Sequence, residues 1–247
     1  MGDVLLVTGG SRGIGAATAL AAARQGYDVC VAYQHRSEEA AAVADGCRAL
    51  GVRAQPVRAD VSREQDVLAL FAAVDGFGPL RALVNNAGIV DRPVPVAELG
   101  VDRIERMLRV NVISAFLCAR EAVRRMSTDR GGTGGVIVNV SSRAATLGSP
   151  NEYVDYAASK AAMDTLTIGL AAEVAQQGIR VNGVRPGIID TEIHASGGQP
   201  DRVERLRDRV PLRRAGRAEE IADAIVWLLS DRASYVTGAL LDVGGGR

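Results

Sequence analysis

Short runs of apolar residues recur along the chain, and longer Ala-rich stretches with helical periodicity separate them. Several runs are apolar at consecutive positions, which is typical of strands covered on both faces. The pattern predicts strands at Val4–Val7, Asp28–Tyr33, Arg53–Arg58, Ala82–Val84, Val136–Val140, Arg180–Val184 and Ala239–Val243. Helices are expected between them, at about 13–25, 37–50, 63–75, 98–127, 154–177 and 217–230.

The alternation of strand and helix predicts a parallel sheet, because right-handed crossovers place the helices on both of its faces. Seven strands in one layer predict a doubly wound α/β fold, and no linker divides the chain, so residues 1–247 are expected to form one domain. Residues 191–214 break the rhythm with glycines, prolines and mixed charges. They follow a strand end, where such sheets bind ligands, and we interpret them as a substrate lid. A solvated loop and helix is the alternative.

The charge balance limits the classes of partner. The chain has 29 basic and 29 acidic side chains, so no net field attracts nucleic acid or an anionic membrane. No apolar run is long enough to span a bilayer, and the N-terminus lacks the features of a signal peptide. Cys30, Cys47 and Cys118 have no metal-like spacing. We therefore expect reduced thiols, a cytoplasmic protein without a metal site, and small molecules and further copies of the chain as partners.

A glycine-rich segment, Thr8–Gly15, follows the first predicted strand and opens the first predicted helix. Glycines permit a tight turn close to a phosphate, and the helix N-terminus presents free N–H groups. The spacing is Gly-x-x-x-Gly-x-Gly rather than Gly-x-Gly-x-x-Gly. Its position favours pyrophosphate binding over a purely structural turn. The residues expected to contact a dinucleotide here are Gly9, Ser11, Arg12, Gly13, Ile14 and Gly15.

The end of the second strand predicts which dinucleotide is bound. NAD sites usually place an acid there to accept hydrogen bonds from the ribose 2′-hydroxyl, but the first acid here is Glu38. Arg12 and Arg36 are instead suited to a 2′-phosphate. The missing acid and the two arginines predict NADP(H), with two ordinary surface charges as the alternative.

Tyr156 and Lys160 lie four residues apart, and so one turn apart on the same face of a predicted helix. A free tyrosine has a pKa near 10 and is a poor base at neutral pH. A lysine and an oxidised nicotinamide both favour the phenolate, and lowering the pKa by about three units needs roughly 4 kcal/mol. Tyr153 lacks a lysine partner, because Ala157 occupies the corresponding position. A surface pair on a helix is the alternative.

Further polar residues follow the ends of the central strands. They are Asn85-Asn86-Ala87-Gly88 after the fourth strand, Asn111 in the next helix, and Asn139-Val140-Ser141-Ser142 at the fifth. Carboxyl ends of parallel strands meet at one edge of a sheet, so these segments can converge on one crevice. A buried amide in a helix needs a partner, which marks Asn111, although a structural asparagine is the alternative.

With these motifs in order, the chain resembles the short-chain dehydrogenase/reductase family over essentially its whole length. The resemblance is greatest to the branch that holds 3-oxoacyl-carrier-protein reductases and glucose dehydrogenases. It implies a single Rossmann-type domain that is usually a tetramer or a dimer, and of these we expect the homotetramer. The motifs that carry it are Thr8-Gly9-x-x-x-Gly13-x-Gly15, Asp60, Asn85-Asn86-Ala87-Gly88, Asn111, Ser142, Tyr156-x-x-x-Lys160, Pro186-Gly187 and Tyr235-Val236-Thr237-Gly238.

The resemblance also implies roles. Tyr156 is the proton donor in reduction and the base in oxidation, and Lys160 lowers its pKa and holds the nicotinamide ribose. Ser142 hydrogen-bonds the substrate oxygen, and Asn111 holds a water that links Lys160 to solvent. Beside Tyr156, Lys160 and the glycine turn, the implied cofactor contacts are Tyr33, Arg36, Asp60, Val61, Asn86, Ala87, Gly88, Pro186, Gly187, Ile189 and Thr191.

One spacing departs from the family. Ser142 to Tyr156 is one residue longer than usual, and the usual spacing would place Arg143 at the serine position. Arginine cannot perform that role, so we keep Ser142 and place the additional residue in Ser149–Asp155.

We therefore predict an NADPH-dependent reductase that converts a carbonyl to an alcohol. The alternatives are an NAD-linked alcohol or sugar dehydrogenase working toward oxidation and a non-catalytic dinucleotide sensor. Arg92 and Arg143 are expected to border the pocket and to favour an anionic or polyhydroxy substrate. His194, in the lid, is a candidate substrate contact, with a solvent-exposed histidine as the alternative.

Overall fold

A parallel sheet forms the centre of the molecule, for which a computed structural model describes residues 2–247 apart from the side chains of residues 194 and 195. Its seven strands lie in the order β3-β2-β1-β4-β5-β6-β7, and every neighbouring pair is parallel. The predicted doubly wound fold is confirmed. The strands are β1 (Val4–Thr8), β2 (Asp28–Tyr33), β3 (Ala54–Arg58), β4 (Leu80–Asn85), β5 (Gly135–Val140), β6 (Ile179–Pro186) and β7 (Leu240–Val243).

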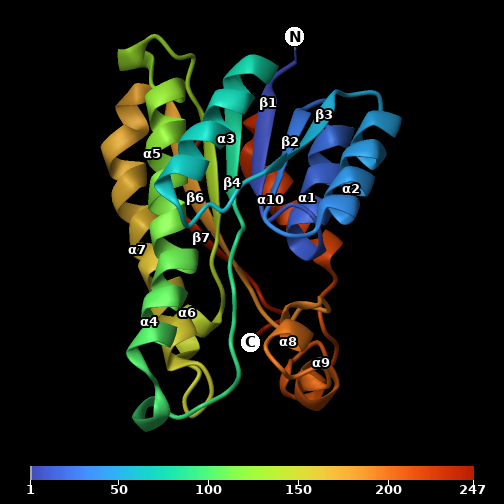
Figure 1. The fold of residues 1–247 in the computed structure, drawn as a ribbon, viewed down its shortest axis with the longest axis vertical. Coiled ribbons are helices and arrows are strands. Elements are labelled where there is room, and N and C mark those ends of the chain that lie inside the picture. The colour runs from blue at the N-terminus through green and yellow to red at the C-terminus, as the bar shows by residue number, and fades with distance from the viewer. Residues whose placement is uncertain (1) are drawn as a thin grey trace.

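Helices cover both faces of the sheet (Figure 1). On one face, α1 (Gly13–Arg24), α2 (Ser37–Ala49) and α10 (Ala218–Leu229) pack on side chains such as Val7 and Val31. On the other, α3 (Glu64–Phe77), α5 (Ser114–Met126) and α7 (Val154–Val174) pack on side chains such as Leu6 and Leu83. Both layers bury their apolar stripes against the strands, which explains why the strands are apolar at consecutive positions.

The single long helix predicted over residues 98–127 is wrong in detail. The helix α4 (Val101–Leu108) passes into a π turn at Arg109–Ile113 before α5 begins. A π turn inserts an additional residue and turns the side chains that follow it, often at a functional site. Asn111 lies in this turn and is 1% exposed.

The carboxyl ends of the strands carry the remaining short helices, α6 (Ala144–Leu147), α8 (Ile193–Ser196) and α9 (Arg202–Leu206) (Figure 1). Here the crossovers from β1 and β4 lead to opposite sides, which opens the crevice where doubly wound sheets bind ligands. The predicted lid leaves this edge and returns to it. Ile189 forms a parallel bridge with Gly216, and the amide of Gly216 donates to the carbonyl of Ile188 at 2.9 Å.

The three cysteines are buried free thiols. Burial raises the pKa of Cys30 and of Cys47 to about 11 and that of Cys118 to about 12. Among the described helices, none is both long and apolar enough to cross a bilayer.

Candidate active site

The glycine turn is held in a conformation that only glycine adopts without strain. Gly9 and Gly13 have φ angles of 63° and 54°. A Cβ on Gly15 would lie 2.4 Å from the carbonyl oxygen of Gly9, so any larger residue would push the turn away from α1. The Asn86 amide donates to the carbonyls of Thr8 and Gly9, at 2.9 and 3.0 Å, and fixes the turn against β4. The backbone is therefore set to approach a phosphate at the start of α1.

A cavity of about 320 Å³ runs along this turn and across the end of β2. Asp60 borders it and accepts hydrogen bonds from the amide and hydroxyl of Ser62, at 3.0 and 2.6 Å, which braces the loop after β3. The sequence-predicted cofactor residues that line this cavity are Gly9, Ser11, Arg12, Gly13, Ile14, Tyr33, Arg36, Asp60, Val61, Asn86, Ala87, Gly88 and Thr191. The shape and the polar rim suit the adenosine half of a dinucleotide.

Both arginines predicted to bind a 2′-phosphate reach the same carboxylate in the lid. Arg12 lies 2.5 Å from Glu192, and Arg36 lies 3.5 Å from the same oxygen. Arg36 also pairs with Glu39 at 2.9 Å. The two guanidinium groups therefore converge on one point that already attracts an anionic group. Sequence reasoning did not identify Glu192, which is 180 positions from Arg12.

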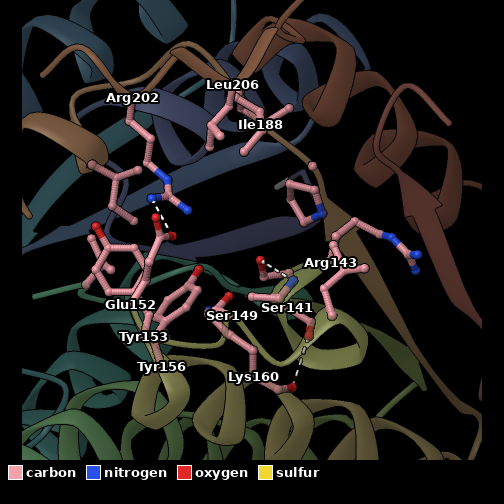
Figure 2. A pocket seen from close by; sticks show the side chains of 18 of the residues that line it. Ser141, Arg143, Ser149, Glu152, Tyr153, Tyr156, Lys160, Ile188, Arg202 and Leu206 are labelled. Atoms are coloured by element: carbon pink, nitrogen blue, oxygen red, sulfur yellow. Dashed lines mark hydrogen bonds and ion pairs between the residues drawn. The ribbon is translucent and has the colours of Figure 1, made fainter. Parts of the chain in front are cut away.

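Tyr156, Lys160 and Ser142 line one cavity at the carboxyl end of β5. Figure 2 shows Tyr156 and Lys160 in this cavity. The ammonium nitrogen of Lys160 lies 5.8 Å from the centre of the Tyr156 ring and donates to the carbonyl of Val140 at 2.8 Å. The Ser142 side chain lies close enough to the Tyr156 hydroxyl to lower its pKa. The predicted acid–base pair and the predicted serine are thus within one cluster.

The electrostatics of this cluster follow from burial. Burial lowers the pKa of Lys160 to about 8, against the opposing effect of the Asp164 carboxylate. Burial raises the pKa of Tyr156, and the Ser142 side chain and the charge of Arg202 lower it. Before a cofactor binds, Tyr156 is therefore a neutral phenol, which is the form that donates a proton.

The two residues that flank Ser142 in the chain make contacts away from Tyr156. Ser141 donates to the carbonyl of Lys160 at 3.0 Å and is 3% exposed, so it has a structural contact. Arg143 turns away to Asp242, at 2.5 Å, and to the carbonyl of Arg247, at 2.7 Å. Ser142 thus faces Tyr156 and Arg143 does not.

The loop between Ser142 and Tyr156 carries local strain. Ser149 and Asn151 have φ angles of 44° and 63°, which residues with a Cβ rarely adopt. These positions fall inside the segment where the sequence places the additional residue.

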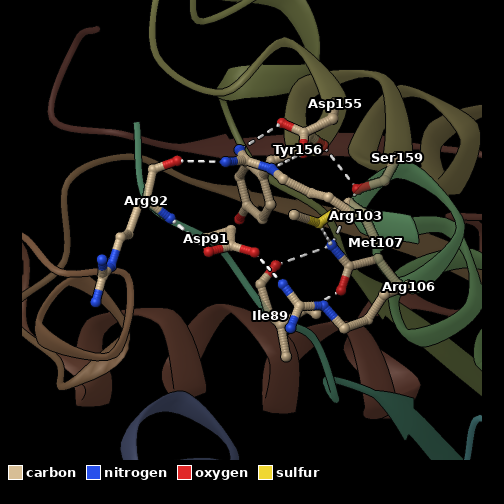
Figure 3. Close-up of polar contacts among 10 residues, drawn as sticks. Ile89, Asp91, Arg92, Arg103, Arg106, Met107, Asp155, Tyr156 and Ser159 are labelled. Atoms are coloured by element: carbon tan, nitrogen blue, oxygen red, sulfur yellow. Dashed lines mark hydrogen bonds and ion pairs between the residues drawn. The ribbon is translucent and has the colours of Figure 1, made fainter. Parts of the chain in front are cut away.

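Asn111 is held by the segment after β4 and by helix α7. Its amide nitrogen donates to the carbonyl of Ile89 and to Ser159 Oγ, each at 3.0 Å, and its oxygen accepts from the amide of Ile89 at 2.8 Å (Figure 3). A Cβ on Gly88 would lie 3.3 Å from that oxygen and 3.4 Å from the Lys160 ammonium. Because position 88 is glycine, both polar groups can face the same small space.

A buried ion pair, which sequence reasoning missed, fixes the start of α7. Arg103 on α4 lies 2.8 Å from Asp155, with side chains 14% and 3% exposed, and it also donates to the carbonyl of Arg92 at 2.6 Å (Figure 3). Asp155 directly precedes Tyr156. The pair therefore ties α4 and the segment after β4 to the helix that carries the candidate acid.

A second cavity, of about 470 Å³, lies above Tyr156 and adjoins the first along Ile14, Asn86, Gly88 and Thr191. Arg202 in α9 lies 2.8 Å from Glu152 across it. Predicted residues that line this cavity are Ile14, Asn86, Gly88, Ser142, Tyr156, Lys160, Pro186, Gly187, Ile189 and Thr191, together with Arg143, whereas Glu152, Arg202, Arg209 and Arg247 were not foreseen.

Three predicted residues stand apart from these cavities. Gly15 and Asn111 line neither of the two and support the residues that do. Arg92 also lines neither and packs against Gly198 in the lid. The side chain of His194 lies outside the described residues.

Known proteins resemble this chain over its whole length. A family model described as enoyl-(acyl carrier protein) reductase matches residues 9–247. An uncharacterized oxidoreductase of Escherichia coli called YgfF is 58% identical over 99% of both chains. The cis-4-hydroxycyclohexanecarboxylate dehydrogenase of Sinomonas cyclohexanicum is 42% identical over 98% of this chain and 95% of that one.

Solved structures agree. A short-chain dehydrogenase from Burkholderia cenocepacia in complex with NADP superposes with a TM-score of 0.90 at 36% identity, covering 100% of this chain and 98% of that one. The motifs, the topology and these relatives together place the chain in the short-chain dehydrogenase/reductase family of oxidoreductases that act on alcohol and carbonyl groups.

Proposed function

We propose that this chain is an NADPH-dependent reductase that converts a carbonyl group to an alcohol, with Tyr156 as the proton donor. The observation that carries the proposal is that Ser142, Tyr156 and Lys160 line one cavity, with the buried ammonium of Lys160 one helical turn from Tyr156. The nicotinamide, when bound, supplies the hydride. The other contributions come from the chain itself.

In reduction, the hydroxyl groups of Tyr156 and Ser142 both bind the substrate oxygen. The negative charge that develops there is stabilised by these two donors, and Tyr156 transfers its proton. The resulting phenolate lies one turn from Lys160, which is protonated at pH 7 because its pKa is about 8. The Asn111 oxygen and the Lys160 nitrogen both face Gly88, and a water there would return a proton from solvent. The same groups in reverse serve oxidation.

The preference for NADPH rests on Arg12 and Arg36. No acid stands at the end of β2, and the cavity along the glycine turn is lined by these two guanidinium groups. Their shared contact with Glu192 supports the view that this point attracts an anion. A 2′-phosphate carries more charge than a carboxylate and accepts bidentate hydrogen bonds from arginine. The relative solved with NADP supports the same choice.

Residues 191–214 are proposed as the lid of a single domain spanning residues 1–247. Their base is closed by the bridge between Ile189 and Gly216. Above it, Glu192 contacts the cofactor side of the crevice and Arg202 contacts the loop before α7. A segment held at its base, and by one ion pair at its start and one in its middle, can open without disturbing the sheet.

A homotetramer is proposed from exposed apolar side chains. Phe116 on α5 and Ile168 on α7 are 51% and 53% exposed, and the two helices pack side by side on the outside of the sheet (Figure 1). Neighbouring apolar side chains on adjacent helices mark an interaction surface, and symmetry would pair the surface with its copy.

The direct test is NADPH oxidation over a panel of ketones, aldehydes and diketones, with Tyr156→Phe beside the wild type. Turnover that falls by at least about a hundredfold in the variant supports the proposal. Tyr153→Phe is the matched control, because Tyr153 lines the same cavity without a lysine one turn on. Equal activity in Tyr156→Phe, or tighter binding of NADH than of NADPH in a fluorescence titration, would contradict the mechanism or the cofactor preference respectively.

A further inference from the structure

One wall of the substrate cavity is basic. Figure 2 shows one of its arginines, Arg202, on the side of the cavity away from Lys160. Arg202, Arg209 and Arg247 line this wall, and they come from α9, from the turn after α9 and from the segment after β7. Two parts of the chain that are far apart in sequence, residues 202–209 and the segment after β7, thus place guanidinium groups around one space.

The acids in this cavity do not balance the bases. Among the described residues that line it, Glu152 is the acidic one, and it pairs with Arg202 at 2.8 Å. Arg202 is 8% exposed and also stacks over the Tyr153 ring at 4.8 Å, so this pair is a fixed part of the wall. Within the described part of the chain, the guanidinium groups of Arg209 and Arg247 have no hydrogen bond or ion pair.

These charges crowd one another. Burial together with the charges of Arg202 and Arg209 lowers the pKa of the Arg247 guanidinium, and Glu152 offsets this only in part. Like charges at the side of a partly enclosed cavity are unfavourable unless an anion joins them. An anion placed there would accept charge-assisted hydrogen bonds from guanidinium groups that have no partner among the described residues.

The same wall lies close to the proposed chemistry. The charge of Arg202 is near enough to Tyr156 to lower its pKa. Ile188 and Leu206 add apolar surface next to Arg202, on the side of the cavity away from Lys160 (Figure 2). A molecule with a carbonyl at Tyr156, an apolar body against these two side chains and an anionic group at the arginines matches the cavity.

We infer that the substrate of this site carries a carboxylate on the side of the molecule away from its reacting carbonyl, and that Arg209 and Arg247 bind it. Arg143, which the sequence suggested for this task, is paired with Asp242 and does not take part. The part of this inference that concerns the reacting carbonyl rests on the proposed reduction. The part that concerns carboxylate binding by Arg209 and Arg247 does not.

The first test compares keto acids with their methyl esters, which have the same carbonyl and no charge. Levulinate and oxocyclohexanecarboxylate, each beside its ester, are reduced with NADPH by the wild type, Arg209→Gln and Arg247→Gln. We expect the wild type to prefer each acid by about tenfold or more in kcat/KM. Each variant should lose that preference through a higher KM for the acid, so that the ratio of kcat/KM on the acid to kcat/KM on its ester falls toward one. Arg207→Gln is the control, because Arg207 pairs with Glu204 outside the cavity.

A preference for the esters, or an equal loss on acids and esters in the variants, overturns the inference. A second measurement needs no turnover. Cyclohexanecarboxylate and cyclohexanecarboxamide are titrated calorimetrically into the NADP-saturated protein, and we expect the carboxylate to bind in the wild type and to weaken about tenfold in Arg209→Gln and Arg247→Gln. Absence of carboxylate binding rejects the anion site. Carboxylate binding without reduction of any ketone would reject the proposed reaction and leave the anion site standing.

Discussion

Lys160 is the only lysine among the 247 residues, and its ammonium group is buried with a pKa of about 8. An unfolded chain would hold the same proton up to about pH 10.5. The two pKa values differ by about 2.5. Since each pKa unit corresponds to about 1.36 kcal/mol, this difference corresponds to about 3 kcal/mol of unfolding free energy. The native protein therefore loses about 3 kcal/mol of stability at pH 7 by keeping this charged group inside.

The sign of the pH dependence follows from proton counts. Below about pH 8 the folded and unfolded states both hold the proton, so the full cost applies. Between about pH 8 and pH 10.5 the unfolded state holds a proton that the folded state has released, so stability rises with pH. Above about pH 10.5 both states have released the proton, and burying the Lys160 side chain no longer carries the free-energy cost of burying a charge.

Lys160→Met removes the ammonium and keeps the length of the side chain. It also removes the hydrogen bond to the carbonyl of Val140, which costs about 1 kcal/mol. We expect the variant to be inactive and yet more stable than the wild type by about 2 kcal/mol at pH 7. By about pH 10.5 that advantage should have vanished or reversed, a change of about 3 kcal/mol. Cysteines and tyrosines titrate in both proteins and cancel in the difference.

Urea unfolding at several pH values measures this difference. Thr167→Val, which replaces a buried hydroxyl on the same helix, is the control and should change stability by the same amount at every pH. Because the chain has one lysine, a protein labelled at lysine gives one side-chain ammonium signal by NMR, and its titration reports the pKa directly. A midpoint near 10.5, or a stability difference that does not vary with pH, would refute the reasoning.

Four further predictions follow from contacts at the site. Arg103→Met strands the Asp155 carboxylate, 3% exposed, without its partner and should lower the free energy of unfolding by about 3 kcal/mol, measured in urea. Gly15→Ala should weaken NADPH binding by more than about tenfold in a fluorescence titration, because the new Cβ would lie 2.4 Å from a carbonyl of the turn. Glu192→Gln should tighten NADPH by about threefold and leave NADH unchanged, since only a 2′-phosphate competes with the carboxylate. Phe116→Glu should yield smaller species in sedimentation if the outer face of α5 is an interface.

Local patterns made the fold and the glycine turn predictable from sequence. The strands are apolar at consecutive positions because both faces are covered, and the turn at Gly9 and Gly13 needs positive φ, which few residues adopt. The predicted strands agree with the structure to within one or two residues at most ends. These features depend on residues that are close together in the sequence, so they can be predicted from the sequence alone.

Contacts between distant segments could not be predicted in this way. The chain has 29 basic and 29 acidic side chains, so sequence offers no reason to pair Arg103 with Asp155, 52 positions away. The π turn around Asn111 was also hidden, because it changes the helical phase without any glycine or proline to signal it. Ser142 was chosen over Arg143 by pattern alone, and the structure adds the reason that Arg143 is paired with Asp242.

The lid links the two halves of the site through charge. Glu192 forms ion pairs with the two arginines proposed to bind the cofactor phosphate. Arg202 forms an ion pair with Glu152, in the loop before Tyr156. A 2′-phosphate at Arg12 and Arg36 repels the Glu192 carboxylate, because like charges a few ångströms apart are unfavourable. On this proposal the start of the lid shifts, whereas its middle stays anchored by the Arg202–Glu152 pair, which is far less exposed. The segment that responds to the cofactor phosphate would then also carry the basic wall of the substrate cavity, so we expect binding at one half of the site to alter the other.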